Sequence, residues 1–267
     1  MSRISATFDE LRQRHEGALI AFFTVGDPRL ELTPRLVKVL SKHADIVELG
    51  IPFSDPIADG PTIQEGIDRA LKASTTPHKA LNVIKKIRRN CKVPLIVLTY
   101  YNILLKPGLE NFIKRFASAG MDGIIVPDLP LEESGELLKV AKKYGVDLVL
   151  LVTPTTNDER LGLICQASSG FVYVVSLFGV TGAREKLSEH VRPLIARVKK
   201  ISSLPIAVGF GISRAEHVAA VMSADADGAI VGSAFVNIVK NNLKNEKKML
   251  REIETFARAL KVSTRKR

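Results

Sequence analysis

Three acidic residues follow one another closely near the end of a short apolar run. Glu48 belongs to the run Asp45–Leu49, and Asp55 and Asp59 follow it in a loop rich in Pro and Gly. A carboxylate in apolar surroundings keeps its proton to a higher pH, and two carboxylates in different settings can divide acid–base and charge-stabilising roles. The pattern therefore indicates proton-transfer chemistry, although aspartates in such loops also commonly cap turns.

Glu48 is the stronger candidate because of its place in a predicted strand. Successive strand side chains face opposite sides, so Glu48 shares its face with Ile46, while Val47 and Leu49 take the other face. If Val47 and Leu49 face covering helices, Glu48 points inward, where burial raises its pKa into the range useful for general acid–base catalysis. The alternative is a buried Glu paired with Lys or Arg. No basic residue occurs in any predicted strand, which favours the catalytic interpretation.

Three loops that carry glycines are candidates for binding an anion. They are Gly179–Gly182, Gly209–Ser213 and Gly232–Ala234, and they follow the sixth, seventh and eighth predicted strands. Exposed backbone N–H groups and a helix N-terminus bind phosphate at this place in many eight-fold α/β barrels. Turn formation alone explains any single glycine pair, but two such loops in succession indicate a phosphorylated small molecule as ligand.

Four aromatic residues lie at strand ends, namely Phe22, Tyr100, Tyr173 and Phe210. Each of them could simply pack in the core, but together they predict an apolar slot for a flat substrate between the carboxylates and the phosphate loops. The five histidines have no metal-ligand spacing, and we expect them at the surface. The two cysteines, Cys91 and Cys165, form neither a metal motif nor a disulfide framework. We therefore expect no metal site.

Short apolar runs recur along the chain and must position these residues. They are continuous rather than alternating, which is typical of parallel strands covered on both faces. The predicted strands are Ala18–Thr24, Asp45–Leu49, Leu95–Thr99, Gly123–Val126, Asp147–Val152, Phe171–Ser176, Ile206–Gly209 and Gly228–Val231. Predicted amphipathic helices between them include Leu109–Ala119, Leu131–Tyr144, Glu189–Ile201 and Arg214–Met222, the last with Ser213 as its expected N-cap.

Strict alternation of strands and helices predicts an α/β fold with a parallel sheet. Eight units in 267 residues, with no Gly-x-Gly-x-x-Gly turn after the first strand, favour a TIM (β/α)8 barrel over an open sheet. The segment Ile4–His15 predicts an extra N-terminal helix over the barrel bottom, and the long connection after the second strand predicts additional helices. No low-complexity linker interrupts residues 1–267, so we expect a single domain with a basic tail at about 262–267.

The net charge of +11 is concentrated at one end of the chain. Ten basic and three acidic residues lie within Lys240–Arg267, which predicts a solvated helix face and a tail rather than a nucleic-acid groove. No apolar run approaches the roughly 20 residues that cross a membrane. The first ten residues include acids and lack an apolar segment, so we expect no signal peptide and a cytoplasmic location.

The run from Glu48 to Gln64, ELGIPFSDPIADGPTIQ, closely resembles the signature of the tryptophan synthase alpha subunit. Supporting matches span nearly the whole chain and include Phe22–Asp27, Tyr100–Asn102, Val126–Pro130, Gly179–Gly182, Gly209–Gly211 and Gly232–Ser233. One departure concerns Ser176-Leu177-Phe178, where many family members carry Ser-Arg-Ala. The missing arginine removes a charge beside the loop after the sixth strand, which bears on loop closure and partner contact rather than on the chemistry.

The resemblance implies a carbon–carbon lyase of tryptophan biosynthesis that cleaves indole-3-glycerol phosphate to indole and glyceraldehyde 3-phosphate. It implies Glu48 as the general acid/base and Asp59 as the residue that holds the indole N–H. The substrate-binding residues that we expect on this basis are Phe22, Leu98, Tyr100, Tyr173, Thr181 and Phe210. The residues that would bind phosphate are Gly182, Gly211, Gly232 and Ser233.

The resemblance also implies a partner, a β subunit that receives the indole in an α2β2-type assembly. The contact surface would include the loops around Ser54–Pro56 and Gly179–Lys186. Pyridoxal phosphate would belong to the β subunit, and no cofactor is expected in this chain. The alternatives are a free-standing lyase, another phosphate-binding barrel isomerase or epimerase, and a non-catalytic binding protein. The Pro-Phe-Ser-Asp-Pro run has no reason to occur in such an isomerase, and intact Glu48 and Asp59 argue against a binding protein.

Overall fold

The computed structural model describes residues 1–175, 190–209 and 211–266. Within them, parallel strands form one sheet in the order β5-β4-β3-β2-β1-β9-β8-β7-β6. The strands are β1 Ala18–Thr24, β2 Ile46–Gly50, β3 Leu95–Leu98, β4 Gly123–Ile125, β5 Asp147–Leu148, β6 Leu151–Val152, β7 Val172–Val175, β8 Ile206–Gly209 and β9 Gly228–Val231. All eight predicted strands are present, the fifth as the two short pieces β5 and β6.

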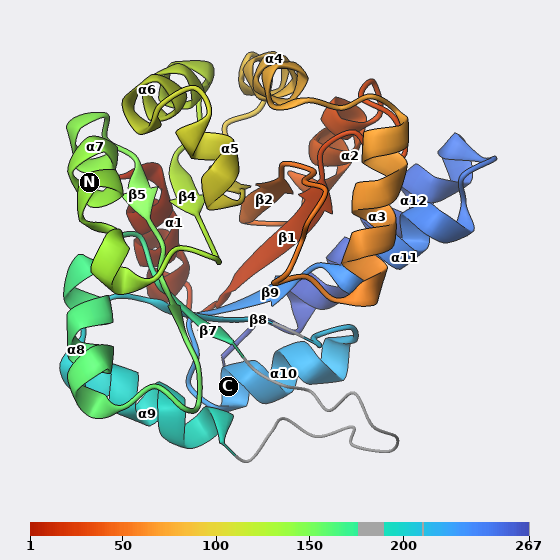
Figure 1. The fold of residues 1–267 in the computed structure, drawn as a ribbon. Helices are drawn as coiled ribbons and strands as arrows, with labels where there is room; N and C mark the ends of the chain where they lie inside the picture. The colour runs from red at the N-terminus through yellow and green to blue at the C-terminus, as the bar shows by residue number, and fades with distance from the viewer. Residues whose placement is uncertain (176–189, 210, 267) are drawn as a thin grey trace.

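The two ends of this strand order belong to one chain segment, and this closes the sheet. β5 pairs with β4, β6 pairs with β7, and only Val149 and Leu150 separate the two pieces. The Val149 N–H donates to the carbonyl of Ile124 at 3.0 Å, and the Leu150 carbonyl accepts from the N–H of Tyr173 at 3.1 Å. The predicted (β/α)8 barrel is therefore confirmed (Figure 1).

Helices surround the barrel, as Figure 1 shows. They are α1 Arg3–Gln13, α2 Thr33–Leu40, α3 Pro61–Lys72, α4 Pro77–Arg88, α5 Tyr101–Leu105, α6 Leu109–Ala119, α7 Gly135–Lys143, α8 Asp158–Ala167, α9 Val191–Ile201, α10 Ala215–Ser223, α11 Ser233–Asn241 and α12 Glu246–Val262, with a 3-10 turn η1 at Leu131–Glu133. The long connection after β2 carries α3 and α4, as predicted. The single helix predicted over 131–144 is divided into η1 and α7, because the Ser134 hydroxyl donates to the Leu131 carbonyl at the junction.

Apolar side chains form an outer and an inner core. Val47 and Leu49 belong to the outer core between strands and helices, as the alternation along β2 predicts. The inner core fills the barrel with side chains that include Ile20, Ile46, Ile96, Ile125, Phe171 and Ile230. Helix α1 adds Ile4, Phe8 and Leu11 to this inner core. The extra N-terminal helix therefore covers the barrel bottom, as predicted.

A polar clamp repeats at the barrel bottom, once for every pair of strands. Asp45, Asp122, Ser169 and Asp227 lie shortly before β2, β4, β7 and β9, which are the second, fourth, sixth and eighth strands around the barrel. The side chain of each accepts a backbone N–H from the start of the preceding strand: Leu19 to Asp45 at 2.7 Å, Leu95 to Asp122 at 2.8 Å, Leu148 to Ser169 at 2.9 Å and Ile206 to Asp227 at 3.0 Å. These bonds satisfy buried donors that would otherwise be left without a partner where the ladder begins.

The basic C-terminal segment lies against this bottom surface. Lys261 pairs with Asp45 at 2.9 Å, and Lys266 pairs with Asp227 at 2.9 Å. The Gly17 N–H donates to the carbonyl of Thr264 at 2.7 Å, so the backbone of the segment is held as well. The prediction of a solvated helix face is right for exposed residues such as Arg251, but it is wrong for Lys261 and Lys266.

Two local predictions around α10 are also wrong. The helix begins at Ala215 with Arg214 as its N-cap, so Ser213 lies one residue too early for that role. His217, which was expected at the surface, is only 6% exposed. Its Nδ1 accepts from the Ser213 N–H at 3.3 Å, so the histidine helps to order the start of the helix. A hydrogen-bond partner of this kind explains why a buried imidazole is tolerated here.

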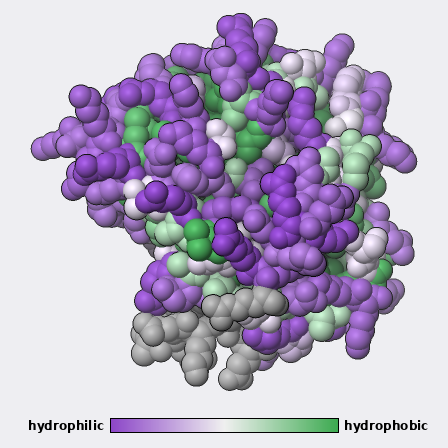
Figure 2. Space-filling view, turned by 180° about the vertical axis from the view of Figure 1, so that it is seen from behind, coloured by the Kyte–Doolittle hydropathy of each residue, from purple (hydrophilic) through white to green (hydrophobic). Residues whose placement is uncertain are grey.

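Within the described residues, no helix is long and apolar enough to cross a membrane. Hydrophilic side chains dominate the face seen in Figure 2, where hydrophobic residues appear as small separate groups. Two large apolar side chains are exposed in the segments that follow β2 and β3: Ile57, in the loop after β2, at 81%, and Leu105, the last residue of α5, at 49%. These segments begin at the end of the barrel where the strands terminate, which we call the mouth.

We expect Asp122→Asn to lower the free energy of unfolding by about 2–4 kcal/mol, because it leaves two guanidinium groups without their carboxylate. Asp122 is 8% exposed and contacts Arg88 at 2.6 Å and Arg3 at 2.7 Å. Urea unfolding measures the change. Asp9→Asn is the matched control, since Asp9 pairs with Arg12 at the surface and should change stability by less than about 0.5 kcal/mol. Equal effects of the two substitutions would contradict the prediction.

Candidate active site

A cavity of about 280 Å³ opens at the mouth of the barrel. The predicted site residues that line it are Phe22, Glu48, Asp59, Leu98, Tyr173, Gly211, Gly232 and Ser233. They come from six different strands or the segments after them, which is the arrangement expected where parallel strands end together. Thr181, Gly182 and Phe210 lie outside the described residues, as does the predicted partner loop Gly179–Lys186.

Glu48 lies on the inner face of β2 with its carboxylate in the cavity wall. Its side chain is in register with Phe22 on β1 and Ile96 on β3, and the residue is 1% exposed. Burial, and to a smaller extent the nearby charge of Asp59, together raise the pKa of Glu48 to about 8. Within the described part of the chain, Glu48 Oε2 has no hydrogen-bond partner, and no Lys or Arg pairs with this carboxylate. The ion-pair alternative for Glu48 therefore has no support there.

Asp59 reaches the same cavity from the loop between β2 and α3. The hydroxyl of Tyr100 donates to Asp59 Oδ2 at 2.6 Å, and the same hydroxyl accepts the Ala58 N–H at 3.2 Å. Burial raises the pKa of Asp59, and the hydrogen bond from Tyr100 lowers it in part. The side chain of Gln64 donates to the Asp59 carbonyl at 2.8 Å, so the turn that carries the carboxylate is held at two points.

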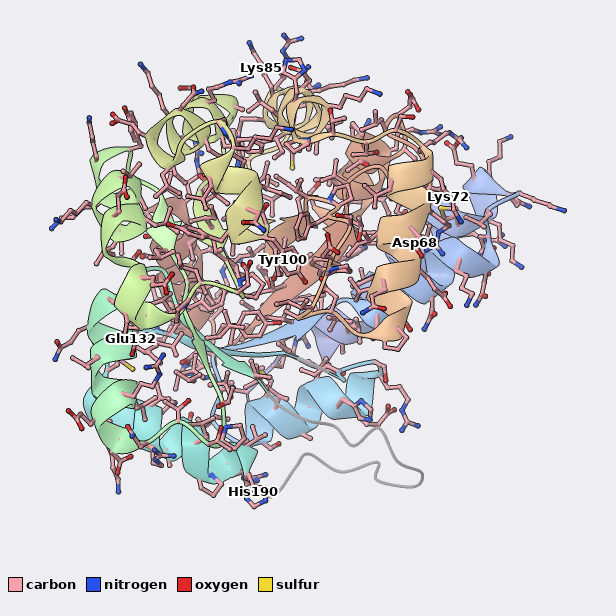
Figure 3. All side chains as sticks on the ribbon, viewed as in Figure 1. Asp68, Lys72, Lys85, Tyr100, Glu132 and His190 are labelled. Atoms are coloured by element: carbon pink, nitrogen blue, oxygen red, sulfur yellow. The ribbon has the colours of Figure 1, made fainter. Side chains whose placement is uncertain are left out.

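The sequence placed Tyr100 at a strand end but did not predict its contact with Asp59. It is 1% exposed, and its ring stacks on Phe53 with the centroids 5.1 Å apart. Figure 3 shows Tyr100 inside the ring of strands, whereas Lys85 and Glu132 lie at the periphery. Tyr100 therefore offers its hydroxyl to Asp59 rather than an open ring face to the cavity. The one feature of the sequence that could have indicated this contact is the position of Tyr100 directly after the third predicted strand, next to the strand whose loop carries Asp59.

Glycines at strand ends make room for the aromatic rings of the cavity. A Cβ on Gly50 would lie 2.8 Å from the ring of Phe22, and a Cβ on Gly232 would lie 3.2 Å from it. A Cβ on Gly209 would lie 2.3 Å from the Tyr173 hydroxyl oxygen. The absence of these side chains leaves the space beside the strand ends that both rings occupy.

The opposite side of the cavity is suited to an anion. β8 and β9 are neighbours in the sheet, so the loops that carry Gly211 and Gly232 meet there. Gly211 has a φ of +78°, a conformation that a side chain would disfavour. Helix α11 begins at Ser233, directly after Gly232, and the N–H groups of its first turn have no intrahelical acceptors. These N–H groups and the helix dipole favour a phosphate at this position.

Within the described residues, no group of three or more His, Cys, Asp or Glu could hold a metal ion. The fold and the cavity define a class of protein: a (β/α)8-barrel enzyme with one buried and one partly buried carboxylate beside an end that is suited to an anion. Comparisons with known proteins give the family. The family model for the tryptophan synthase alpha chain matches residues 8–265.

The tryptophan synthase alpha chain of Methanocaldococcus jannaschii is 52% identical over 255 residues, which cover 95% of this chain and 90% of that protein. The corresponding protein of Arabidopsis thaliana is 44% identical over 97% of this chain and 94% of its own length. A solved structure of the Legionella pneumophila alpha subunit has a TM-score of 0.90 at 34% identity and covers 99% of this chain and 98% of that one.

A chain of the tryptophan synthase α2β2 complex from Pyrococcus furiosus has a TM-score of 0.87 at 40% identity, with 92% of this chain and 98% of that chain covered. The chain described here belongs to the tryptophan synthase alpha chain family. Its activity is the lyase half-reaction of tryptophan synthesis, the cleavage of indole-3-glycerol phosphate to indole and glyceraldehyde 3-phosphate. An isomerase, an epimerase or a non-catalytic binding protein is therefore excluded.

The pKa of Glu48 predicts how stability depends on pH. The unfolded chain releases this proton near pH 4.5, whereas the folded chain keeps it to about pH 8, so wild-type stability falls as the pH rises through that window. Glu48→Gln has no proton to lose. We therefore expect its stability advantage over the wild type to grow between pH 5 and pH 8 in urea unfolding. Glu136→Gln, at an exposed position, is the control. Parallel pH curves for Glu48→Gln and the wild type would contradict the burial of an uncompensated carboxyl.

Proposed function

We propose that Glu48 is the general acid/base of the cleavage and that Asp59 holds the indole N–H and stabilises positive charge on the ring. The observation that carries the proposal is that two carboxylates share one cavity in different settings. Glu48 is buried among apolar side chains, whereas Asp59 receives a hydrogen bond from Tyr100. Such a difference in setting divides the roles of two carboxyl groups.

The bond to be broken joins C3 of the indole to the first carbon of the glycerol chain, which carries a hydroxyl group. A proton added at C3 places positive charge on the ring and on its N–H, where the carboxylate of Asp59 stabilises it. The carbon–carbon bond then breaks, and the electron pair of that bond returns to the ring. The hydroxyl loses its proton in the same step, and its oxygen becomes the carbonyl oxygen of the aldehyde. With a pKa of about 8, Glu48 carries a proton at neutral pH, so it can donate to C3 and then accept the hydroxyl proton.

The remaining predicted residues orient the substrate in this scheme. Phe22, Leu98 and Tyr173 line the part of the cavity that would hold the flat ring, and Tyr100 fixes Asp59 from behind. Gly211, Gly232 and Ser233 would bind the phosphate. The roles of Thr181, Phe210 and Gly182 remain predictions, because these residues lie outside the described part of the chain.

We also propose that a β subunit takes up the indole in an α2β2-type assembly. The support comes from the similarity to a chain of the Pyrococcus furiosus α2β2 complex and from the exposed loop that contains Ser54, Asp55 and Ile57. Indole is apolar, and its release into solvent loses the product unless a second enzyme receives it. The β subunit would bind the pyridoxal phosphate. The absence of a cofactor in this chain, its cytoplasmic location and its single-domain organisation remain predictions.

We expect Glu48→Gln to lower the rate of indole-3-glycerol phosphate cleavage by about 10²–10⁴-fold, because the amide is nearly isosteric but cannot carry the proton. Indole release by the purified chain measures the rate. Binding of glycerol phosphate, followed by calorimetry, should survive and is the control for an intact site. Near-normal turnover by the variant would remove Glu48 from its proposed role.

We expect Gly232→Asp to weaken glycerol phosphate binding about tenfold, since it places a carboxylate beside the anion at the start of α11. A Cβ at this position also lies 3.2 Å from the ring of Phe22, so the added bulk has its own effect. Gly232→Asn is the matched control, because it adds the same bulk without the charge. If the Asp and Asn variants bind glycerol phosphate equally well, the phosphate does not lie at this helix end.

A further inference from the structure

His217 is a buried polar side chain that has no part in the reaction scheme above. It is the third residue of α10, the helix that follows β8. Its Nδ1 accepts the backbone N–H of Ser213 at 3.3 Å and lies 3.5 Å from the hydroxyl oxygen of the same residue. Nη2 of the exposed Arg214 lies 3.4 Å from Nε2. Both ring nitrogens therefore face the residues that immediately precede the helix.

The hydrogen bond from Ser213 fixes one end of the loop after β8, of which Gly211, Ile212 and Ser213 are described. Gly211 and Ile212 line the catalytic cavity. The side chain of Ile212 is buried in the outer core, and the next backbone N–H along the chain donates to His217. Two successive anchors therefore follow Gly211, an apolar side chain and a backbone hydrogen bond. Figure 1 shows α10 next to β8, on the outside of the barrel.

An anchor at this point matters because a backbone N–H faces an anion only where the main chain of the loop is fixed. Glycine adopts positive and negative φ angles about equally readily, so Gly211 by itself does not hold the loop at its φ of +78°. The constraint must come from the residues that follow it. Donors that are already in place bind a ligand more tightly, because no free energy is then lost in ordering the loop.

We propose that His217 is a positioning residue for the phosphate group of the substrate. Through the Ser213 N–H, it holds the loop after β8 in the conformation that presents backbone N–H groups to the phosphate. This inference rests on the proposed function, since it presupposes that Gly211 and Gly232 bind that group. The contact resembles a capping box, in which the side chain at the third helical position accepts a backbone N–H at the start of the helix.

The test compares side chains at position 217 that differ in their ability to accept the N–H. His217→Leu fills the buried site without an acceptor, whereas glutamine at this helical position supplies an acceptor in capping boxes. We expect His217→Leu to raise the Kd of glycerol phosphate about five- to tenfold, and His217→Gln to stay within about twofold of the wild type. His217→Phe keeps a planar ring without nitrogen and should show the same loss as His217→Leu. Calorimetric titration with glycerol phosphate measures all three.

The kinetics of indole-3-glycerol phosphate cleavage provide a second measurement. Glu48 and Asp59 lie on β2 and in the loop after it, away from the contact of His217 with Ser213. We therefore expect His217→Leu to raise KM by about the same factor as the Kd of glycerol phosphate and to leave kcat within about twofold, as for a loss of uniform binding. A fall in kcat at an unchanged KM would overturn the proposal.

Val221→Ala is the control for a general loss of stability in α10. Val221 is fully buried in the same helix, so its truncation should lower the urea midpoint and leave the Kd of glycerol phosphate unchanged. A His217→Leu variant that behaves in the same way would have a purely structural defect, and the proposal would be overturned. Equal losses of affinity in His217→Leu and His217→Gln would also overturn it, because the acceptor would then not be the cause.

The Gly232→Asp and Gly232→Asn variants, titrated alongside, separate this inference from the proposed function. If Gly232→Asp binds glycerol phosphate more weakly than Gly232→Asn while His217→Leu binds it like the wild type, the phosphate site stands and the role of His217 falls. If Gly232→Asp and Gly232→Asn bind equally well, the proposed phosphate position is wrong, and the inference about His217 falls with it.

Discussion

Glu48 lies between Phe22 and Ile96 on the inner face of a closed barrel, and the properties of the site depend on this burial. The loss of water around the carboxyl, together with the nearby charge of Asp59, raises its pKa to about 8, so a group that is ionised in solution keeps its proton at neutral pH. Closure of the sheet is what makes the burial possible. The break between β5 and β6 lets one chain segment complete both edges, and the inner core then surrounds the carboxylate from every strand.

The carboxylates at the two ends of the barrel differ in the partners that surround them. At the bottom, Asp45 and Asp227 accept backbone N–H groups and pair with Lys261 and Lys266, and at Asp45 these partners offset part of the rise in pKa that burial causes. At the mouth, the described residues provide no cation for Glu48, so the same loss remains as a raised pKa. The carboxylates at the bottom therefore have partners that favour their charged form, whereas Glu48 has none among the described residues and keeps its proton to a higher pH.

The fold was predictable because it follows from patterns that are local in sequence. Continuous apolar runs marked the strands, and the alternation within β2 gave the inward direction of Glu48. The bonds that join distant segments had no such signal. The contact of Tyr100 with Asp59 needs the loop after β2 to fold over the end of β3, and the pairing of Lys266 with Asp227 needs the barrel to close. The composition of a basic tail is the same whether its side chains face solvent or pair with carboxylates of the barrel. The sequence alone therefore could not predict the pairing of Lys266 with Asp227.

Glu48 and Asp59 differ in how firmly the structure fixes their positions. Glu48 is fixed by the register of β2 with its two neighbouring strands, so a change at its position would require a change of the sheet. Asp59 belongs to a loop, and a single neutral hydroxyl from Tyr100 directs its carboxylate. In the proposed mechanism, a contact with the loop after β2 would alter the stabilisation of positive charge on the indole ring, while Glu48 would keep its place on the strand. In this proposal, a partner that binds the loop after β2 would act on the step in which positive charge develops on the ring, and it would not displace Glu48 from the strand.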